Sequence, residues 1–381
     1  MNQNELIRFA QRAVNIQSFT NEEGPLANEV LKEMKRLNYD EAFIDSTGNV
    51  IGRIGNGPKI IHFDSHLDTV RVHDPEEWQY PPFSGEIVNG YLWGRGSVDM
   101  KSALCASVYA AAIARDNNWT EGKTIYVTGT VCEEYCDGEN LKHLYDELSL
   151  NPDYCVICEP SNNVITLGHK GKAQMRIVTH GVSAHGAAPE KGVNAVYEMA
   201  EIISRVEALN KSLYKENEPH GTIVLSDISS VSASLNAVPS ECSIYLDRRL
   251  ALGETLEQVN HEMNQLISGK KATWEVGTLY HTTWTGKELV YEPMHNPWKI
   301  NKEHDLTQAL IAAYQNVYQE DPDQFDFWDF GTNAVTPVSK GIPCIGFGPG
   351  DYKFAHMKDE RCSIKQIEEA CLIYGQLIKE L

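Results

Sequence analysis

Short polar segments at the ends of predicted strands constrain the fold of this 381-residue chain more than any other feature. Five such segments together offer two histidines and several carboxylates. They read Asp64-Ser65-His66-Leu67-Asp68, Gly94-Arg95-Gly96-Ser97-Val98-Asp99-Met100-Lys101, Cys132-Glu133-Glu134, Cys158-Glu159-Pro160 and Ala355-His356. Because imidazole and carboxylate groups are zinc ligands, this inventory suits a pair of zinc-like ions with one glutamate left over. A fold is therefore expected that gathers these strand ends at one place.

The chain before residue 173 alternates predicted helices and strands, which is typical of an α/β sheet covered on both faces. Apolar residues at helical spacing, or in a nearly continuous run, predict helices over 5–14, 25–37 and 102–114. Apolar runs predict strands over 59–63, 123–131 and 154–158. His66, Glu133, Glu134 and Glu159 follow the carboxyl ends of these strands, and open α/β sheets bind ligands at that edge.

A different order of elements begins near residue 173. Strands and helices are predicted in the order β-α-β-β-α-β over 173–178, 194–213, 221–226, 242–247, 255–267 and 273–281. This order is the ferredoxin-like pattern. A helix over 306–317, a strand over 342–347 and a helix over 364–378 then resume the first style. We therefore expect a mixed-sheet α/β domain over 1–172 and 294–381, with a ferredoxin-like domain inserted over 173–293.

Charge and cysteine content narrow the classes of partner. The formal charge is −20, and an acidic chain repels phosphate backbones, so nucleic acid is not expected as a partner. No apolar run approaches the ~20 residues of a membrane span, and the first residues do not resemble a signal peptide. Nine cysteines fit a reduced, cytoplasmic protein, with packing as their expected role. Cys155 and Cys158 form a C-x-x-C inside a predicted strand, without a second pair to complete a zinc site.

Each segment also has an ordinary structural interpretation. Asp99 suits a helix N-cap, Glu159 a turn after a strand, and His356 a surface loop. His66 alone could simply end a strand. The adjacent pair Glu133-Glu134 is harder to explain in this way, because burying two carboxylates is costly without a cation nearby. The combination favours a metal centre over five unrelated features.

Taken in order, these segments make the chain similar to the acetylornithine deacetylase / succinyl-diaminopimelate desuccinylase / zinc carboxypeptidase family of dinuclear metallohydrolases. The resemblance covers essentially the whole chain. Asp247-Arg248-Arg249 and Gly346-Phe347-Gly348-Pro349-Gly350 make it most similar to the selenium-metabolism-linked hydrolase branch. It implies a zinc-peptidase-like catalytic domain and an inserted domain that serves as lid and dimer interface.

The resemblance also implies roles for the candidate residues. Asp99 would bridge two divalent ions, zinc in the first place with cobalt or manganese as alternatives. His66 and Glu159 would complete one site, and Glu134 and His356 the other. Glu133 would be the general base, Asp68 would hold the His66 imidazole through a hydrogen bond, and the Asp99–Met100 peptide bond would be cis.

Motifs of the inserted domain and one late segment imply substrate contacts. Gly181-Val182-Ser183-Ala184-His185-Gly186 matches the motif whose histidine, often from the partner subunit, stabilises the oxyanion. Asn236 begins a matching N-x-x-P segment. Arg249 matches an arginine that binds a substrate carboxylate, with a salt bridge to Asp247 as the alternative. Phe330-Gly331-Thr332-Asn333 stands where the family often has Gly-Gly-Thr-Asp. Thr332 and Asn333 would contact substrate, and the missing carboxylate argues against a substrate held there by its free amine.

The implied reaction is hydrolysis of an amide bond in a small N-acylated or N-carbamoylated amino acid or short peptide. A hydroxide that bridges the two metals would attack the carbonyl. A di- or aminopeptidase is the nearest alternative. A non-catalytic metal-binding relative is a further one, against which the spare carboxylate of Glu133 speaks. The sequence leaves open the acyl group, the side chain accepted, the metal, and whether His185 acts in its own subunit or its partner's.

Overall fold

Four parallel strands form the centre of a nine-stranded mixed sheet in the computed structural model, which describes residues 3–216 and 218–381. The sheet order is β1-β2-β6-β3-β7-β18-β8-β16, and β17 pairs with β8. Strands β6, β3, β7 and β18 run parallel, whereas β2 and β8 pair antiparallel with their neighbours. The strands of this sheet are β1 (Glu41–Ile44), β2 (Val50–Gly55), β3 (Lys59–His66), β6 (Lys123–Thr130), β7 (Tyr154–Ile157), β8 (Ile165–His169), β16 (Trp298–Lys299), β17 (Phe325–Trp328) and β18 (Cys344–Gly346).

The described chain divides into two compact units. The first comprises Met1–Gly168, Tyr280–Val290 and Lys299–Leu381, and the second His169–Leu279 and Tyr291–Trp298. The predicted inserted domain, residues 173–293, differs from this division mainly at 280–290. That segment forms a hairpin of β13 (Leu279–Thr282) and β14 (Glu288–Tyr291) and belongs to the first unit.

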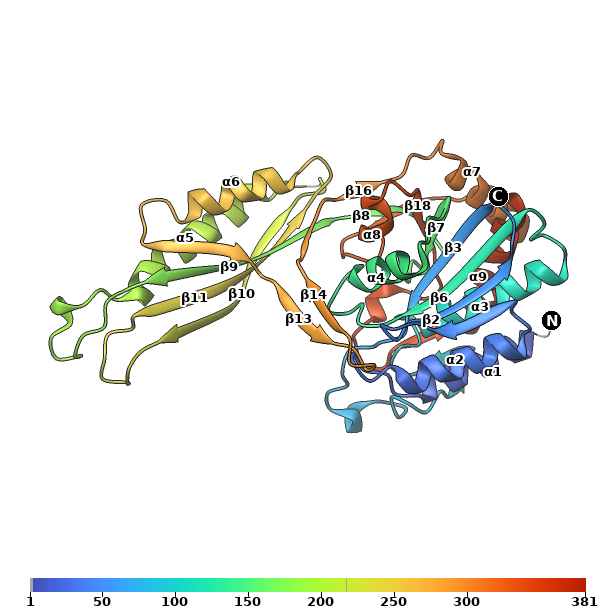
Figure 1. Cartoon of the computed structure of the whole chain (residues 1–381), viewed down its shortest axis with the longest axis horizontal. Coiled ribbons are helices and arrows are strands. Elements are labelled where there is room, and N and C mark those ends of the chain that lie inside the picture. Colours follow the sequence, from blue (N-terminus) through green and yellow to red (C-terminus); the bar gives the residue numbers. More distant parts are fainter. Residues whose placement is uncertain (1–2, 217) are drawn as a thin grey trace. The chain divides into compact units, whose positions relative to one another are not determined.

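Helices cover the large sheet because their apolar residues match its apolar faces. The predicted buried helix is α3 (Lys101–Asp116), which contacts strands β3 and β6 of the sheet and the helices α1 and α9 (Figure 1). The helices of the first unit are α1 (Gln3–Asn15), α2 (Gly24–Arg36), α3, α4 (Glu139–Leu148), α7 (Asp305–Tyr318), α8 (Val335–Ser339) and α9 (Ile364–Glu380). A small sheet of β4 (Ile87–Val88), β5 (Tyr91–Trp93) and β19 (Arg361–Ser363) joins two distant parts of this unit. Short 3-10 turns lie at Pro75–Glu77 and Tyr352–Phe354.

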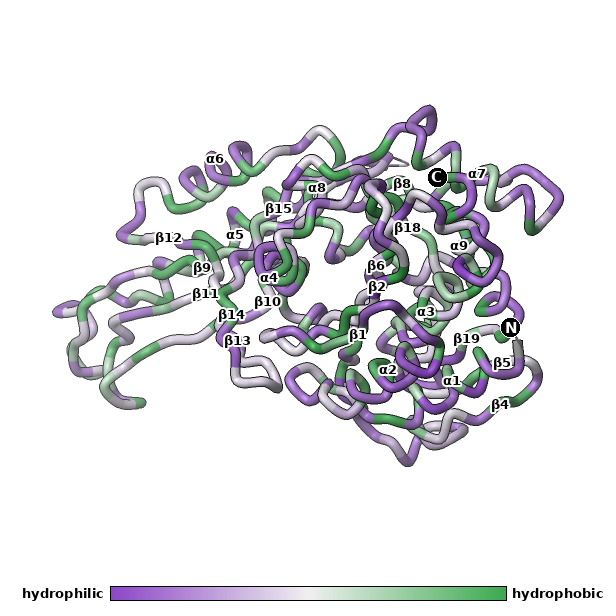
Figure 2. The backbone as a smooth tube through the Cα atoms, turned by 45° about the vertical axis from the view of Figure 1, so that its right-hand side comes forward, coloured by the Kyte–Doolittle hydropathy of each residue, from purple (hydrophilic) through white to green (hydrophobic). Residues whose placement is uncertain are grey.

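The second unit has the predicted β-α-β-β-α-β order. Its elements are β9 (Gly171–His180), a 3-10 turn (Pro189–Lys191), α5 (Ala195–Leu213), β10 (Thr222–Val231), β11 (Glu241–Leu250), α6 (Leu256–Leu266), β12 (Ala272–Val276) and β15 (Met294–His295). The antiparallel sheet has the order β10-β11-β9-β12, and β15 also pairs with β9. Helices α5 and α6 pack on the sheet through a buried core that includes Met175, Ile177, Met199, Ile244 and Met263. Along the tube of α6, hydrophobic residues recur between hydrophilic ones, as expected for an amphipathic helix (Figure 2).

One predicted strand is wrong. Residues 273–281 form two strands, β12 and β13, in different units. The break falls at Gly277, whose backbone lies against the Tyr245 ring, so that a Cβ there would be 2.5 Å from the Tyr245 hydroxyl oxygen.

The α/β fold class with a mixed sheet is confirmed. All nine cysteine side chains are buried, as expected for packing residues.

Candidate metal centre

Neighbouring parallel strands bring the predicted ligand segments to one edge of the large sheet. His66 is the last residue of β3 and lies opposite Thr130, the last residue of β6. Glu133 and Glu134 follow β6, and Glu159 follows β7, which pairs with β3 on its other side. Since parallel strands end at the same edge, the register of the sheet brings these segments close together.

Two groups of candidate ligands share one aspartate. His66, Asp99 and Glu159 form one group, and Asp99, Glu134 and His356 form the other. In each group the three candidate ligand atoms all lie within 4.8 Å of one another. His66 Nε2 is 2.9 Å from Asp99 Oδ1, and His356 Nε2 is 3.2 Å from Asp99 Oδ2. The two oxygens of Asp99 therefore face two different histidines.

The remaining two ligands complete these groups at similar distances. Glu159 Oε1 is 3.6 Å from His66 Nε2, and Glu134 Oε2 is 3.1 Å from His356 Nε2. Imidazole nitrogens and carboxylate oxygens are donors that zinc, cobalt and manganese accept, so the residues present fit two divalent cations.

The electrostatics of the cluster also favour a cation. Burial, followed by the negative charges of Asp99 and Glu134, holds the pKa of Glu159 well above its ordinary value, although the nearby His66 acts in the opposite direction. Burial and then the charge of Asp99 raise the pKa of Glu134. Hydrogen bonds to Asp99 and Glu134 raise the pKa of His356 to about 10. Crowded carboxylates thus draw protons onto themselves and onto the imidazoles, and a bound divalent cation would replace those protons.

Glu133 is the carboxylate that belongs to neither group. Its side chain is buried, and burial followed by the charge of Glu159 raises its pKa well above the ordinary value. It lies one residue before the candidate ligand Glu134. This placement leaves it available for proton transfer next to the cluster.

Asp68 contacts the His66 imidazole, as expected, but mainly through its backbone carbonyl. The imidazole Nδ1 of His66 lies 2.9 Å from the backbone carbonyl oxygen of Asp68 and 3.5 Å from its carboxylate. The carboxylate instead accepts hydrogen bonds from the backbone N–H groups of Glu133 and Glu134, at 3.0 and 3.2 Å. The carbonyl therefore orients the histidine, and the carboxylate holds the turn that carries the two glutamates.

The loop that presents Asp99 has an unusual backbone. The Asp99–Met100 peptide bond is cis, as the resemblance implied. Gly96 has a φ of +83°, and a Cβ there would lie 2.8 Å from a Thr69 methyl carbon. Only glycine suits such a conformation in so narrow a space.

The polar side chains of Thr332 and Asn333 are hydrogen-bonded within the protein. Asn333 is buried, and its amide nitrogen donates to Asp64 at 2.8 Å and to Thr130 at 3.0 Å. Its amide oxygen accepts from the Gly138 backbone at 2.8 Å. Thr332 is also buried, and its hydroxyl oxygen accepts from the Ala334 backbone. The expected substrate contacts of Thr332 and Asn333 are therefore not supported: Asn333 joins β3 to the end of β6, and Thr332 holds the turn of its own segment, which their sequence context does not reveal.

Three predicted substrate residues lie in the second unit. The His185 and Asn236 segments are neighbours: the Gly186 N–H donates to the Asn236 carbonyl at 2.7 Å, and His185 forms a β-bridge with Ala237. The His185 side chain is exposed. Arg249 makes a two-point ion pair with Asp247, at 2.8 and 3.0 Å.

Several further residues support the segments that carry the candidate ligands, and no sequence pattern indicates these contacts. The Thr20 hydroxyl donates to the Asp68 carboxylate at 2.9 Å. Glu23, the residue before α2, accepts from the Cys132 backbone at 3.0 Å. His281 on β13 stacks on Tyr135, with ring centroids 5.1 Å apart, directly after Glu134. Such contacts join segments far apart in the chain, so local patterns do not indicate them.

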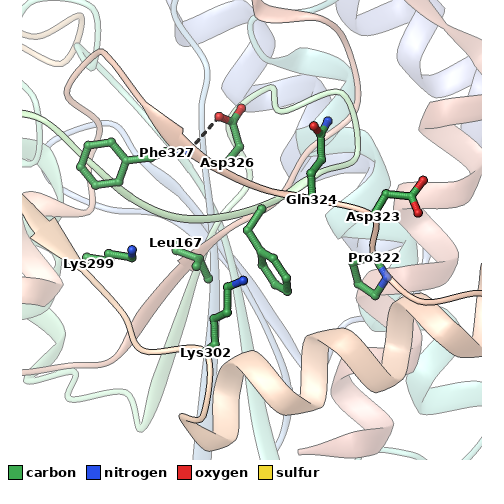
Figure 3. A pocket seen from close by; sticks show the side chains of 9 residues that line it. Leu167, Lys299, Lys302, Pro322, Asp323, Gln324, Asp326 and Phe327 are labelled. Carbon is green, nitrogen blue, oxygen red and sulfur yellow. Dashed lines mark hydrogen bonds between the residues drawn. The ribbon is translucent and has the colours of Figure 1, made fainter. Parts of the chain in front are cut away.

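A pocket of about 480 Å³ in the first unit is not the candidate site. It is lined by residues of three segments, among them Leu167, Lys299, Lys302, Phe325 and Phe327, and by neither ligand group (Figure 3). Lys302 lies over the Phe325 ring, with its ammonium 4.0 Å from the ring centroid. The candidate ligands lie at the edge of the large sheet and do not line this pocket.

An α/β sheet that gathers two carboxylate–histidine groups around a shared aspartate, beside a spare buried glutamate, is the design of a metal-dependent amidohydrolase or metallopeptidase. The chain belongs to the peptidase family M20/M25/M40, whose model matches residues 62–380.

Individual relatives agree with this assignment over nearly the whole chain. The chain is 35% identical to the uncharacterised protein YgeY of Escherichia coli K12 over 380 residues, 98% of this chain and 94% of that one. It is 28% identical to succinyl-diaminopimelate desuccinylase of Corynebacterium glutamicum, over 98% of this chain and 96% of that one. The fold matches that of aminopeptidase PepT from Bacillus cereus with a TM-score of 0.75 at 21% identity, over 100% and 99% of the two chains. Placement near the selenium-metabolism-linked branch stays a prediction.

The described residues contain no helix that is both long and apolar enough to cross a membrane.

Proposed function

We propose that the chain is a two-cation hydrolase that cleaves the amide bond of a small N-acylated or N-carbamoylated amino acid or short peptide. The observation that carries this proposal is the position of Asp99, whose two carboxylate oxygens face His66 and His356 separately. A fourth carboxylate, that of Glu133, stands beside both groups without belonging to either.

His66, Asp99 and Glu159 would hold one cation, and Asp99, Glu134 and His356 the other. Two such cations supply Lewis acidity, which lowers the pKa of water and polarises a carbonyl group. Glu133 would take a proton from the attacking water and deliver it to the leaving nitrogen, as the new C–O bond forms and the C–N bond breaks. Asp68 and Thr20 would keep the Glu133 turn in place through the hydrogen bonds described above.

The substrate class rests on the chemistry of the second unit together with the family. Arg249 is suited to a carboxylate because a guanidinium binds planar anions at two points. The desuccinylase relative, by its name, removes an acyl group from an amino acid. Asn333 is neutral and fully hydrogen-bonded, which does not favour a substrate anchored there by an ammonium group.

His185 and Arg249 would act on one substrate only from different subunits. β11 pairs with β9 so that Glu241 lies opposite His180, near the His185 loop, and Arg249 lies opposite Lys172 at the other end of the strand. Eight residues of extended strand separate Glu241 from Arg249, or roughly 27 Å at ~3.4 Å per residue. A small substrate cannot span that length, so a homodimer in which His185 serves the partner's site accounts for both roles.

The second unit offers an edge for such a dimer. β10 is the outer strand of its sheet and exposes Val224, Ile228 and Val231. An uncovered apolar edge strand favours pairing with a like strand from a second copy.

The decisive experiment is an assay of metal-reconstituted protein on matched N-acetyl, N-succinyl and N-carbamoyl amino acids, dipeptides and tripeptides. Zinc, cobalt and manganese would each be tested, with chelator-treated protein as the control. Preferential turnover of an acylated or carbamoylated amino acid supports the proposal. Turnover of free-amine peptides alone supports a di- or aminopeptidase. Bound metal without turnover of any substrate supports a non-catalytic metal-binding relative.

A further inference from the structure

Glu360 is a fully buried acid, 0% exposed, that follows the candidate ligand His356 by four residues. One of its carboxylate oxygens accepts hydrogen bonds from the backbone N–H groups of Val98 and Asp99, at 2.8 and 3.1 Å. The other accepts from Arg95 Nη1 at 2.5 Å. The backbone of the shared aspartate is thus bound directly by a side chain from the His356 segment.

Arg95 extends this connection to the second ligand. Its guanidinium is buried against the Trp78 ring, and Nη2 donates to the backbone carbonyl of His356 at 3.4 Å. The Gly94 N–H also donates to the Glu360 carbonyl at 2.9 Å. The pair Glu360–Arg95 therefore contacts the backbones of both Asp99 and His356.

Both ligands lie in irregular backbone just beyond a short β-ladder. β5 and β19 pair over three residues, and Asp99 follows β5 whereas His356 precedes β19. His356 itself has a φ of +60°. This ladder ends before it reaches Asp99 or His356. Side-chain contacts hold the residues between the ladder and each candidate ligand.

We propose that Glu360 is a positioning residue for the Asp99–Glu134–His356 group, and that it sets the affinity of this group for its cation. The inference rests on the proposed two-cation site. Its physical basis is preorganisation: groups that orient ligands typically change metal affinity by 10–100-fold when they are removed. His66 and Glu159 stand at the ends of β3 and β7 and are held by the sheet, so their group depends less on Glu360.

The test is a calorimetric titration of metal-free protein with Zn²⁺, comparing wild type with Glu360→Gln. Wild type should bind two cations per chain. His66→Ala and His356→Ala identify which binding step belongs to which group. Glu360→Gln should weaken the step that His356→Ala removes by 10–100-fold, and should weaken the other step much less.

Glu33→Gln is the matched control for general loosening. Glu33 is also a buried glutamate of the first unit, and it accepts from Arg36 at 2.7 Å and from Arg12 at 2.9 Å, away from the ligand segments. The Glu33→Gln variant should have a lower melting temperature than wild type and the same affinity for both zinc ions. Equal weakening of both steps by Glu360→Gln, or wild-type affinity for both, would overturn the inference.

A second variant covers the case in which Glu360→Gln does not fold. Arg95→Lys keeps a positive charge opposite Glu360 but removes the guanidinium contact to His356. It should weaken the same binding step, and wild-type affinity for both cations in this variant would then overturn the inference. If wild type itself binds fewer than two cations, the proposed function fails first, so the two failures are distinguishable.

Discussion

The acidic residues of this site have similar side chains but different surroundings, and those surroundings indicate a different role for each. Glu134 and Glu159 each contact a histidine, whereas Glu133 stands apart from both ligand groups. Asp68, two residues after His66, acts on the turn of Glu133 and Glu134 rather than mainly on the imidazole. Residue type and spacing indicate the ligands, but only the contacts separate a ligand from a base or a support.

Glu133→Gln tests the proton-transfer role. The amide keeps the size of the side chain but cannot accept a proton, so kcat should fall by about 10²–10⁴. The variant should still bind two zinc ions, measured by metal analysis after dialysis. Glu33→Gln, a change at a buried glutamate away from the ligand segments, is the control and should keep most of the activity. Wild-type turnover by Glu133→Gln would assign the base to another residue.

Arg249→Met tests whether the guanidinium binds a substrate carboxylate or only Asp247. We expect kcat/KM for an acid substrate to fall about tenfold to a hundredfold, the equivalent of ~1.5–3 kcal/mol, because a charge-assisted pair is lost. The carboxamide analogue of the substrate should be affected little. Asp247→Asn removes only the intramolecular partner and should retain the preference for the acid. An equal loss on acid and amide would leave Arg249 with a structural role.

At the scale of elements, Trp284 is one of the side chains that tie the hairpin of β13 and β14 to the rest of the first unit. Trp284 lies between the strands, and its indole N–H donates to the Gly48 carbonyl at 3.2 Å. A Cβ on Gly24 or Gly48 would meet the indole ring at 2.9 and 2.4 Å. The two glycines therefore make room for Trp284.

Trp284→Ala should destabilise the protein by about 3 kcal/mol, since a packed indole is lost and a cavity remains. Denaturant unfolding followed by circular dichroism measures this loss. Tyr280→Ala changes an exposed aromatic residue of the same hairpin and should stay within about 0.5 kcal/mol of wild type. A similar unfolding free energy for both variants would show that the hairpin is not anchored through Trp284.

The strands that precede the candidate ligands were the easiest elements to predict from the sequence, because an apolar run that ends in polar residues marks the end of a buried strand. β3, β6 and β7 lie where such runs occur, and the ferredoxin-like order followed from the same periodicity. The return of 280–290 to the first unit was not predictable, since it depends on a fit between Trp284 and two distant glycines. Glu360 was missed for a related reason: a side chain that binds backbone N–H groups leaves no motif of paired residue types.

At the scale of the whole molecule, the proposed dimer makes each site depend on two chains. Mixing His185→Ala protein with Glu133→Gln protein should restore activity, because a mixed dimer would contain one site with both changes and one intact site. Random exchange yields about half mixed dimers, each with one intact site of two, so roughly a quarter of wild-type activity is expected. Each variant mixed with itself is the control.

Subunit exchange must be verified independently, for example with a tagged copy of one variant. Exchange without any recovered activity, or a monomer at micromolar concentration, would rule out a site shared between subunits.

The order of the strands has a consequence for how the protein is made. β18 is translated after the other strands of the large sheet, yet it occupies an interior position of that sheet, between β7 and β8. A ribosome therefore releases His66, Asp99, Glu134 and Glu159 while the sheet still has a gap, and His356 emerges only after the strand that fills it. Until then the nascent chain exposes apolar strand edges, which makes it a substrate for chaperones at this stage. Premature termination before residue 344 would leave a product with an open sheet and only four of the five candidate ligands.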